Sequence, residues 1–246
     1  MTSDPQHLGD RFRFAETRWT IVSGAQTSNP ARAQAALESL CQTYWYPLYS
    51  YVRRKGYSAH DAEDLTQGFF ERLLARDFLE NVGKEKGRFR SFLLASMNYF
   101  LRDEYARIQR KKRGGGQRLI SLDQSTAEER YHLEPVDQLT PEHLFEKQWI
   151  LTLLEKVLSV LRSQYVAQDK ADLFDELKVV LTLGKAAPPF AKLSKQLGMS
   201  ETATRMAASR LRQRYREQLR AEIAETVARP EEIDGELQHL FAALGR

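Results

Sequence analysis

Apolar residues recur three or four positions apart along most of this chain, and this spacing constrains its fold more than any other feature. Residues 31–55 carry Leu37, Leu40, Tyr44 and Leu48 at such steps. This period is that of one face of an α-helix, whereas a half-buried strand alternates at every second residue. No segment alternates as a strand does, so the sequence predicts an all-α fold.

Two further helices are predicted before residue 113. Ser58 stands where an N-cap is expected and Asp61 follows three residues later, a pattern that favours a helix start. The next predicted helix covers residues 89–112. Together the three helices make a predicted first domain, residues 31–113, which an N-terminal extension precedes at residues 1–30.

A run of three glycines separates the first domain from a second. Gly114 and its two successors end the helical period, because glycine raises the entropic cost of an ordered helix. Residues 114–139 lack sustained periodicity and are expected to form a flexible linker, mostly extended or irregular. Pro141 then marks the start of a second small helical domain, residues 140–223, and a C-terminal helical extension follows at residues 224–246.

The second domain holds a helix-turn-helix pattern. A short amphipathic segment leads to Gly198, where a positive φ would let the chain turn, and Ser200 follows as an N-cap. In such a motif the second helix enters the major groove. The polar residues of its outward stripe are the predicted DNA contacts: Ser200, Glu201, Thr202, Arg205, Ser209, Arg212 and Arg216. The alternative for these arginines is an ordinary exposed helix, with Glu217 and Glu222 as ion-pair partners.

Positive charge is clustered rather than spread. The chain carries a formal net charge of only +4, yet residues 102–118 hold seven arginines or lysines against two acids. The third predicted helix also interleaves aromatic residues with arginines, a composition suited to stacking unpaired bases beside a phosphate backbone. Tyr99 and Tyr105 lie off its apolar stripe and are the candidate contacts, whereas Phe100 and Leu101 are expected in the core.

These segments, in this order, resemble a bacterial RNA polymerase sigma factor of the extracytoplasmic-function group in the sigma-70 family. YSAHDAEDLTQGFFERLL resembles the family's core-polymerase-binding helix, and GRFRSFLLASMNYFLRDEYARIQRKKR resembles its minus-ten helix. LGMSETATRMAASRLRQRYREQL resembles the helix that reads the minus-thirty-five element. The resemblance covers most of residues 31–223, and it implies partners in the polymerase core enzyme and promoter DNA.

The resemblance assigns roles to two sets of residues in the first domain. Those implied to bind core polymerase are Asp61, Asp64, Gln67 and Glu71. Those implied to bind the minus-ten element are Arg88, Arg90, Asn98, Tyr99, Arg102, Tyr105 and Arg110. Without the resemblance, the acidic residues from Asp61 onward would be read as a solvated helix face.

The chain departs from the most compact members of that group. A longer stretch precedes its helix-turn-helix pattern, and about 25 residues follow the predicted recognition helix. Such segments leave regulation open between an anti-sigma factor, a protein kinase acting on a residue such as Thr66 or Ser125, and self-inhibition by the C-terminal helix.

Other classes of function remain as alternatives or are excluded. A conventional helix-turn-helix regulator with a helical sensor domain is the alternative to a sigma factor. The five histidines lack ligand spacing, GGGQRLIS lacks the lysine of a phosphate loop, and Cys41 is the only cysteine. No catalytic residue, metal site or cofactor is therefore predicted. A lone cysteine and the absence of a membrane span favour the cytoplasm.

Overall fold

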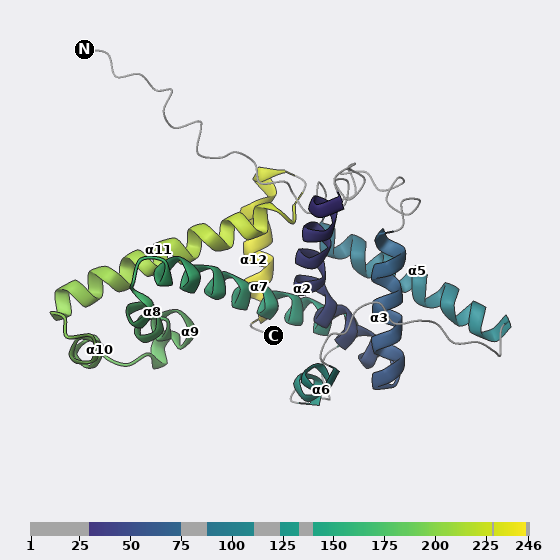
Figure 1. The fold of residues 1–246 in the computed structure, drawn as a ribbon, viewed down its shortest axis with the longest axis horizontal. Helices are drawn as coiled ribbons and strands as arrows, with labels where there is room; N and C mark the ends of the chain where they lie inside the picture. Colours follow the sequence, from purple (N-terminus) through teal and green to yellow (C-terminus); the bar gives the residue numbers. More distant parts are fainter. Residues whose placement is uncertain (1–29, 75–87, 111–123, 133–139, 228, 245–246) are drawn as a thin grey trace, which may run out of the picture. The chain divides into compact units, whose positions relative to one another are not determined.

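The computed structural model describes residues 30–74, 88–110, 124–132, 140–227 and 229–244 (Figure 1). All regular elements in these ranges are helical, with no strand among them, which confirms the predicted all-α class for the described part of the chain. The principal helices are α2 (Pro30–Arg54), α3 (Ala59–Leu74), α5 (Phe89–Arg110), α6 (Gln124–His132), α7 (Pro141–Val166), α8 (Ala171–Leu177), α9 (Val179–Thr182), α10 (Phe190–Leu197), α11 (Glu201–Ala224) and α12 (Ile233–Leu244).

The chain divides into two compact units. The first comprises Met1–Ile150 together with Ala224–Arg246, and the second comprises Leu151–Ile223. The first boundary thus falls inside α7, and α12 belongs to the first unit. The second domain was predicted to begin at residue 140 rather than at Leu151, because the prediction followed the glycine run and Pro141 rather than the packing of side chains. Its predicted end at residue 223 coincides with the end of the second unit.

Aromatic side chains build the core of the first unit. The ring of Tyr44 in α2 lies 5.4 Å from that of Phe89 in α5 and 6.3 Å from that of Trp149 in α7, centroid to centroid. All three side chains are fully buried. Aromatic pairs at such distances add to the stabilisation from the apolar area they remove from water. The first part of α7 therefore belongs to this core.

The turn between α2 and α3 follows the predicted chemistry. Gly56 has a φ of 95°, a left-handed conformation that a side chain would strain. The Oγ of Ser58 accepts a hydrogen bond from the backbone N–H of Asp61 and donates one to its carboxylate, at 3.1 and 2.7 Å. This reciprocal cap starts α3, which then packs closely on α5: a Cβ added at Gly68 would meet the ring of Phe100 at 3.4 Å.

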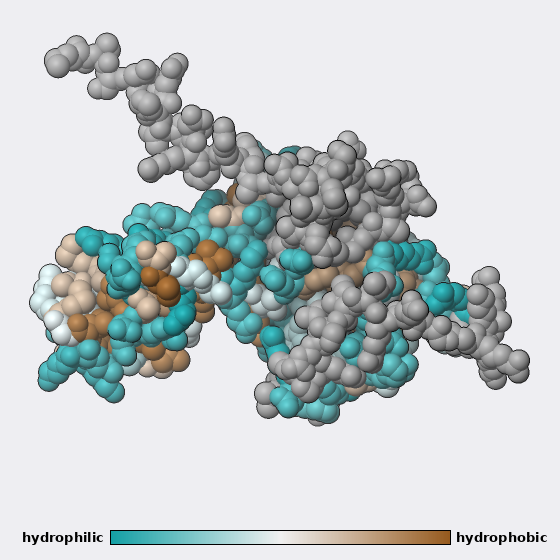
Figure 2. Space-filling model, in the orientation of Figure 1, coloured by the Kyte–Doolittle hydropathy of each residue, from teal (hydrophilic) through white to brown (hydrophobic). Residues whose placement is uncertain are grey.

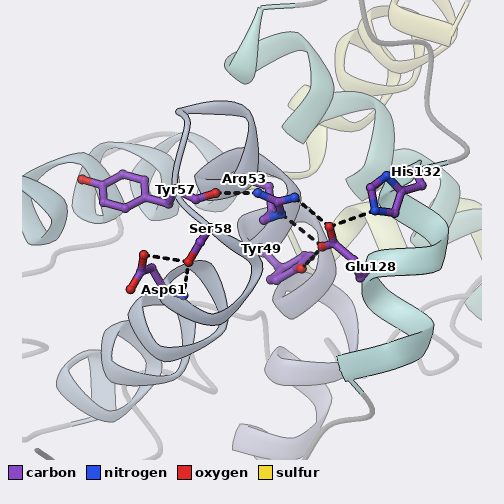
Figure 3. Close-up of polar contacts among 7 residues, drawn as sticks. All are labelled: Tyr49, Arg53, Tyr57, Ser58, Asp61, Glu128 and His132. Carbon is purple, nitrogen blue, oxygen red and sulfur yellow. Dashed lines mark hydrogen bonds and ion pairs between the residues drawn. The ribbon is translucent and has the colours of Figure 1, made fainter.

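The predicted irregular linker contains a helix, α6, and this part of the prediction is wrong. Ala127 of α6 is buried, and the guanidinium of Arg130 lies 4.2 Å from the ring centroid of Tyr46 in α2. Glu128 is held by Tyr49 and Arg53 of α2 (Figure 3). The segment has no sustained apolar period, so the contacts that support this helix come from residues distant in sequence.

The second unit is built on the later part of α7. Its core includes Leu153 and Val157, and the ring of Tyr165 lies 5.5 Å from that of Phe174 in α8. The segment from Leu173 to Leu183 is divided at Lys178 into α8 and α9. Figure 2 shows hydrophobic residues gathered on the visible face of this unit, over the region of α8 to α10.

Candidate nucleic-acid interface

The turn between α10 and α11 has the geometry that its sequence predicts. Gly198 adopts a left-handed conformation with a φ of 62°, and the N–H of Met199 donates to the carbonyl oxygen of Ser194 at 3.0 Å. This bond closes the C-terminus of α10 in the way common for helices that end at a glycine. Ser200 then caps α11, because its Oγ accepts a hydrogen bond from the N–H of Ala203 at 3.2 Å.

The two faces of α11 divide as its apolar period predicts. Thr204, Ala208, Leu211 and Leu219 recur at helical spacing and are buried, whereas Tyr215, which shares this spacing, is only half-buried. The predicted DNA contacts are all exposed: Ser200, Glu201, Thr202, Arg205, Ser209, Arg212 and Arg216. The structure thus brings all seven onto accessible surface, starting at the N-terminus of α11.

Arg205 is held in place by two neighbours. Its guanidinium forms an ion pair with Glu201 one turn earlier, with an N to O distance of 2.5 Å, and lies 4.7 Å from the ring centroid of Phe190 in α10. An exposed pair of this kind contributes little free energy because water and salt screen it. The pair therefore orients the side chain of Arg205 but is weak enough to be exchanged for a contact with a ligand.

The outer face of α5 exposes two aromatic rings. Tyr99 is 66% exposed and Tyr105 is 62% exposed, which for tyrosine leaves most of the ring open to solvent. Arg102 is also exposed, and its guanidinium lies 5.9 Å from the ring centroid of Tyr99. Arg110 ends α5, and its side chain lies outside the described residues.

Arg90 does not lie on this face, and its predicted role in binding DNA needs correction. Its side chain is 3% exposed and forms an ion pair with the carboxylate of Glu236 in α12, which is itself 1% exposed. The guanidinium also lies 3.7 Å from Glu146 of α7 and 5.0 Å from the ring centroid of Trp149. Burial lowers the pKa of Arg90 to about 10, and the nearby carboxylate of Glu146 offsets part of this decrease. At neutral pH it is a charged side chain of the core.

Two more of the predicted minus-ten contacts, one directly before α5 and one on it, are engaged within the unit. Arg88 is half-exposed and pairs with the same Glu236 at 2.8 Å. Asn98 is half-buried; its carbonyl oxygen accepts the hydroxyl hydrogen of Tyr51 at 2.7 Å, and its amide donates to the carbonyl oxygen of Leu94 at 3.2 Å. The accessible part of the predicted minus-ten set is thus centred on Tyr99, Arg102 and Tyr105.

The acidic face of α3 is accessible at three of its four predicted positions. Asp61, Asp64 and Glu71 are exposed, and the carboxylate of Asp64 lies 3.7 Å from the ring of His60. Gln67 is instead 8% exposed, so its placement on the solvent face is wrong. The helical period put Gln67 near the edge of the polar face, where packing decides burial.

Two ionic clusters hold the first unit together, and sequence patterns did not reveal them. One joins Glu236 of α12 to Arg90 of α5 and to Arg88, which directly precedes α5. The other centres on Glu128 of α6, whose carboxylate accepts hydrogen bonds from Tyr49 and from Arg53, the latter at 2.6 Å (Figure 3). Arg53 also donates to the carbonyl oxygen of Tyr57 at 2.5 Å, just before the cap of α3. The sequence signal for the first cluster is limited to an acidic residue, Glu236, within the amphipathic C-terminal helix.

Several residues that could carry other chemistry are inaccessible. Cys41 is buried, and burial raises the pKa of its thiol to about 11, so the reactive thiolate is disfavoured. Thr66, considered as a phosphorylation site, is fully buried and donates its hydroxyl to the carbonyl oxygen of Ala62 at 2.7 Å. Ser125 lies in α6, but its side chain is outside the described set. Among the described residues no group of three or more His, Cys, Asp or Glu side chains could hold a metal ion.

None of the helices with described coordinates has the combined length and apolar character needed to cross a bilayer.

Comparison with known proteins found no family model, no curated protein and no solved structure that matches this chain. The geometry of the two exposed helical faces is therefore the basis on which function is inferred.

Proposed function

We propose that this chain is a sigma factor of the extracytoplasmic-function type, which binds the core of RNA polymerase and directs it to promoters. In this role α11 reads the minus-thirty-five duplex, and α5 captures bases of the opened minus-ten element. The protein works in the cytoplasm, without a cofactor, and performs no catalysis of its own. An anti-sigma factor or a protein kinase is a further expected partner.

The observation that carries this proposal is the exposure of Tyr99 and Tyr105 on a helix other than the one that presents Arg205, Arg212 and Arg216. Extruding a base from a duplex costs a few kcal/mol, and stacking on an aromatic ring offsets about 1 to 3 kcal/mol of it per base. A conventional regulator that reads only duplex DNA gains nothing from two solvent-exposed rings beside an arginine. A sigma factor uses both kinds of surface.

The acidic face of α3 supports the polymerase part of the proposal. Asp61, Asp64 and Glu71 form an exposed negative strip on a chain whose net charge is positive. Such a strip suits a basic docking site, because complementary charge steers association and fixes orientation. The capping hydrogen bonds between Ser58 and Asp61 hold the start of this strip in a defined position.

In vitro transcription tests the proposal directly. Purified core enzyme is mixed with the chain and a library of genomic fragments, and the transcripts are sequenced to find their start sites. We expect discrete start sites that core enzyme alone does not produce. Asp64→Arg should abolish both these transcripts and the retention of core enzyme in a pull-down.

Asp172→Arg is a matched control, because Asp172 is an exposed acid of α8 in the second unit and lies outside the strip. It should retain core enzyme as the unmodified chain does. If the unmodified chain supports no initiation, or if both variants retain polymerase equally well, the sigma-factor proposal fails. Duplex binding without polymerase dependence would then favour the conventional regulator.

A further inference from the structure

The second unit has a groove between the end of α7 and the middle of α11. Two adjoining hollows of about 290 and 420 Å³ form it, and they share Gln168, Arg214 and Glu217 in their linings. Buried Tyr165 and Leu161 of α7 form part of its walls. The groove is open to solvent along its length, as suits a chain segment more than an enclosed small molecule.

This groove lies on a different side of α11 from the predicted DNA contacts. Successive residues of an α-helix turn by about 100°, so Arg214 is about 160° from Arg212 around the axis and Arg210 is about 140° from Arg205. Arg210 and Arg214 line the groove, whereas Arg205 and Arg212 do not. The helix therefore carries two separate arginine faces, and the proposed function uses only one of them.

Positive charge dominates the groove. Lys170, Arg210 and Arg214 line it and are exposed, against a single carboxylate, that of Glu217. Neither Arg210 nor Arg214 forms an ion pair with any described residue. The guanidinium of Arg214 lies 5.3 Å from the ring centroid of Tyr165, which orients it toward the groove at little entropic cost.

Amide groups fill most of the remaining polar lining. The glutamines are Gln164, Gln168, Gln213 and Gln218. Each amide offers both a donor and an acceptor, the two functions that a peptide backbone also presents. Glu217 accepts a hydrogen bond from Gln213 at 2.9 Å and keeps acceptor capacity for a backbone N–H. A phosphate backbone has no such donor to offer this carboxylate.

We propose that this groove binds an extended, acidic segment of a partner protein. Arg210, Arg214 and Lys170 pair with its carboxylates, and the glutamines bond its backbone. Leu173 and Ala207, which also line the groove and are half-buried, contact its apolar side chains. The site goes beyond the proposed function, since neither polymerase nor promoter DNA is needed to fill it. A partner bound there leaves Arg205, Arg212 and Arg216 free to contact DNA.

Fluorescence anisotropy on the full chain tests this site without polymerase. The probe is a short fluorescein-labelled peptide of alternating glutamate and leucine, and the comparison peptides replace glutamate with glutamine or lysine. We expect the glutamate peptide to bind and the other two to bind at least about tenfold more weakly. Arg210→Glu combined with Arg214→Glu should weaken the glutamate peptide by at least about tenfold.

Lys192→Glu combined with Lys195→Glu is the matched control, because it changes net charge equally at exposed positions of α10 outside the groove. This control should leave the affinity for the peptide within about twofold of that of the unmodified chain. If Arg210→Glu with Arg214→Glu unfolds the chain, Arg210→Gln with Arg214→Gln provides a milder test. The proposal is overturned if the glutamate peptide does not bind, or if both double charge reversals weaken its binding equally. It is also overturned if promoter duplex displaces the peptide and the Arg210→Glu, Arg214→Glu variant loses as much affinity for the duplex as for the peptide. These outcomes leave the sigma-factor test unaffected, because that test reads polymerase-dependent initiation.

Discussion

The carboxylate of Glu236, close to the C-terminus, forms an ion pair with the guanidinium of Arg90 at the start of α5, and both side chains are almost fully buried. The same carboxylate reaches Arg88 at 2.8 Å. The C-terminal segment is therefore a part of the first unit rather than an appendage to the second. Helix α12 thus stabilises the N-terminal end of α5, which precedes the exposed Tyr99 and Tyr105.

Glu236→Ala should destabilise the first unit strongly. Removing one partner of a buried ion pair leaves the other charge without compensation, at a typical cost of about 3 to 5 kcal/mol. Hydrogen exchange of the amides in the first turns of α5, followed with and without urea, would report this destabilisation locally. Glu231→Ala, at an exposed position of the preceding turn, should change it by less than about 0.5 kcal/mol. Equal protection in the two variants would contradict a stabilising role for the pair.

The docking of α6 on α2 should weaken in acid. The hydrogen bond from Arg53 holds the pKa of Glu128 below its ordinary value of 4.5, and burial opposes this only in part. A carboxylate with a depressed pKa in the folded state contributes stability that is complete above the unfolded pKa and is lost as pH falls through the folded one. Exchange protection in α6, corrected for intrinsic rates, should therefore fall below about pH 4.5.

Glu128→Gln provides the control for this pH dependence. Tyr49, Arg53 and His132 all face the carboxylate, so the glutamine keeps neighbours to bond but cannot titrate. Its α6 should be less protected at neutral pH, and the acid transition should vanish. A transition of the same size in this variant would assign the effect to another group.

Arg205→Ala should cost about 1 to 3 kcal/mol at one base pair of the promoter and relax selectivity there. Arg205 lies early in α11 and is oriented by Glu201 and Phe190 toward the exposed face. Binding to a panel of duplexes with single substitutions would measure this effect. An equal decrease in affinity for every duplex would assign Arg205 to the phosphates.

Arg216→Ala should instead weaken all duplexes alike. Arg216 is exposed three turns further along α11, beyond the part of a recognition helix that meets base edges. Removing one ion pair between an arginine and a phosphate should reduce the slope of log K against log salt by roughly one unit. An unchanged slope would show that Arg216 does not bind a phosphate.

Tyr99→Ala should reduce affinity for single-stranded DNA of the non-template minus-ten sequence by about 1 to 3 kcal/mol, because a base can no longer stack on this exposed ring. Tyr99→Phe keeps the ring and should bind nearly as well as the unmodified chain. Anisotropy with a labelled oligonucleotide would measure both variants. If phenylalanine is as damaging as alanine, the hydroxyl rather than the ring binds the DNA.

The sequence alone was sufficient for the class of fold and for the local geometry of α11. The helical period predicted its outward polar stripe, and Gly198 and Ser200 predicted its start. The exposure of Tyr99 and Tyr105 followed from the same reasoning on α5. These features depend on residues within a few turns of one another, where helical geometry relates spacing to direction.

The tertiary structure decided which charged and polar residues of the first unit remain accessible. Arg90 and Gln67 were expected on the surface, and both are buried. Glu128 and Glu236 gave no periodic signal, yet each holds a helix in place through arginines far away in the sequence. A charge pair between distant segments depends on how whole helices pack. Helical periodicity describes the faces of one helix at a time and contains no information about that packing.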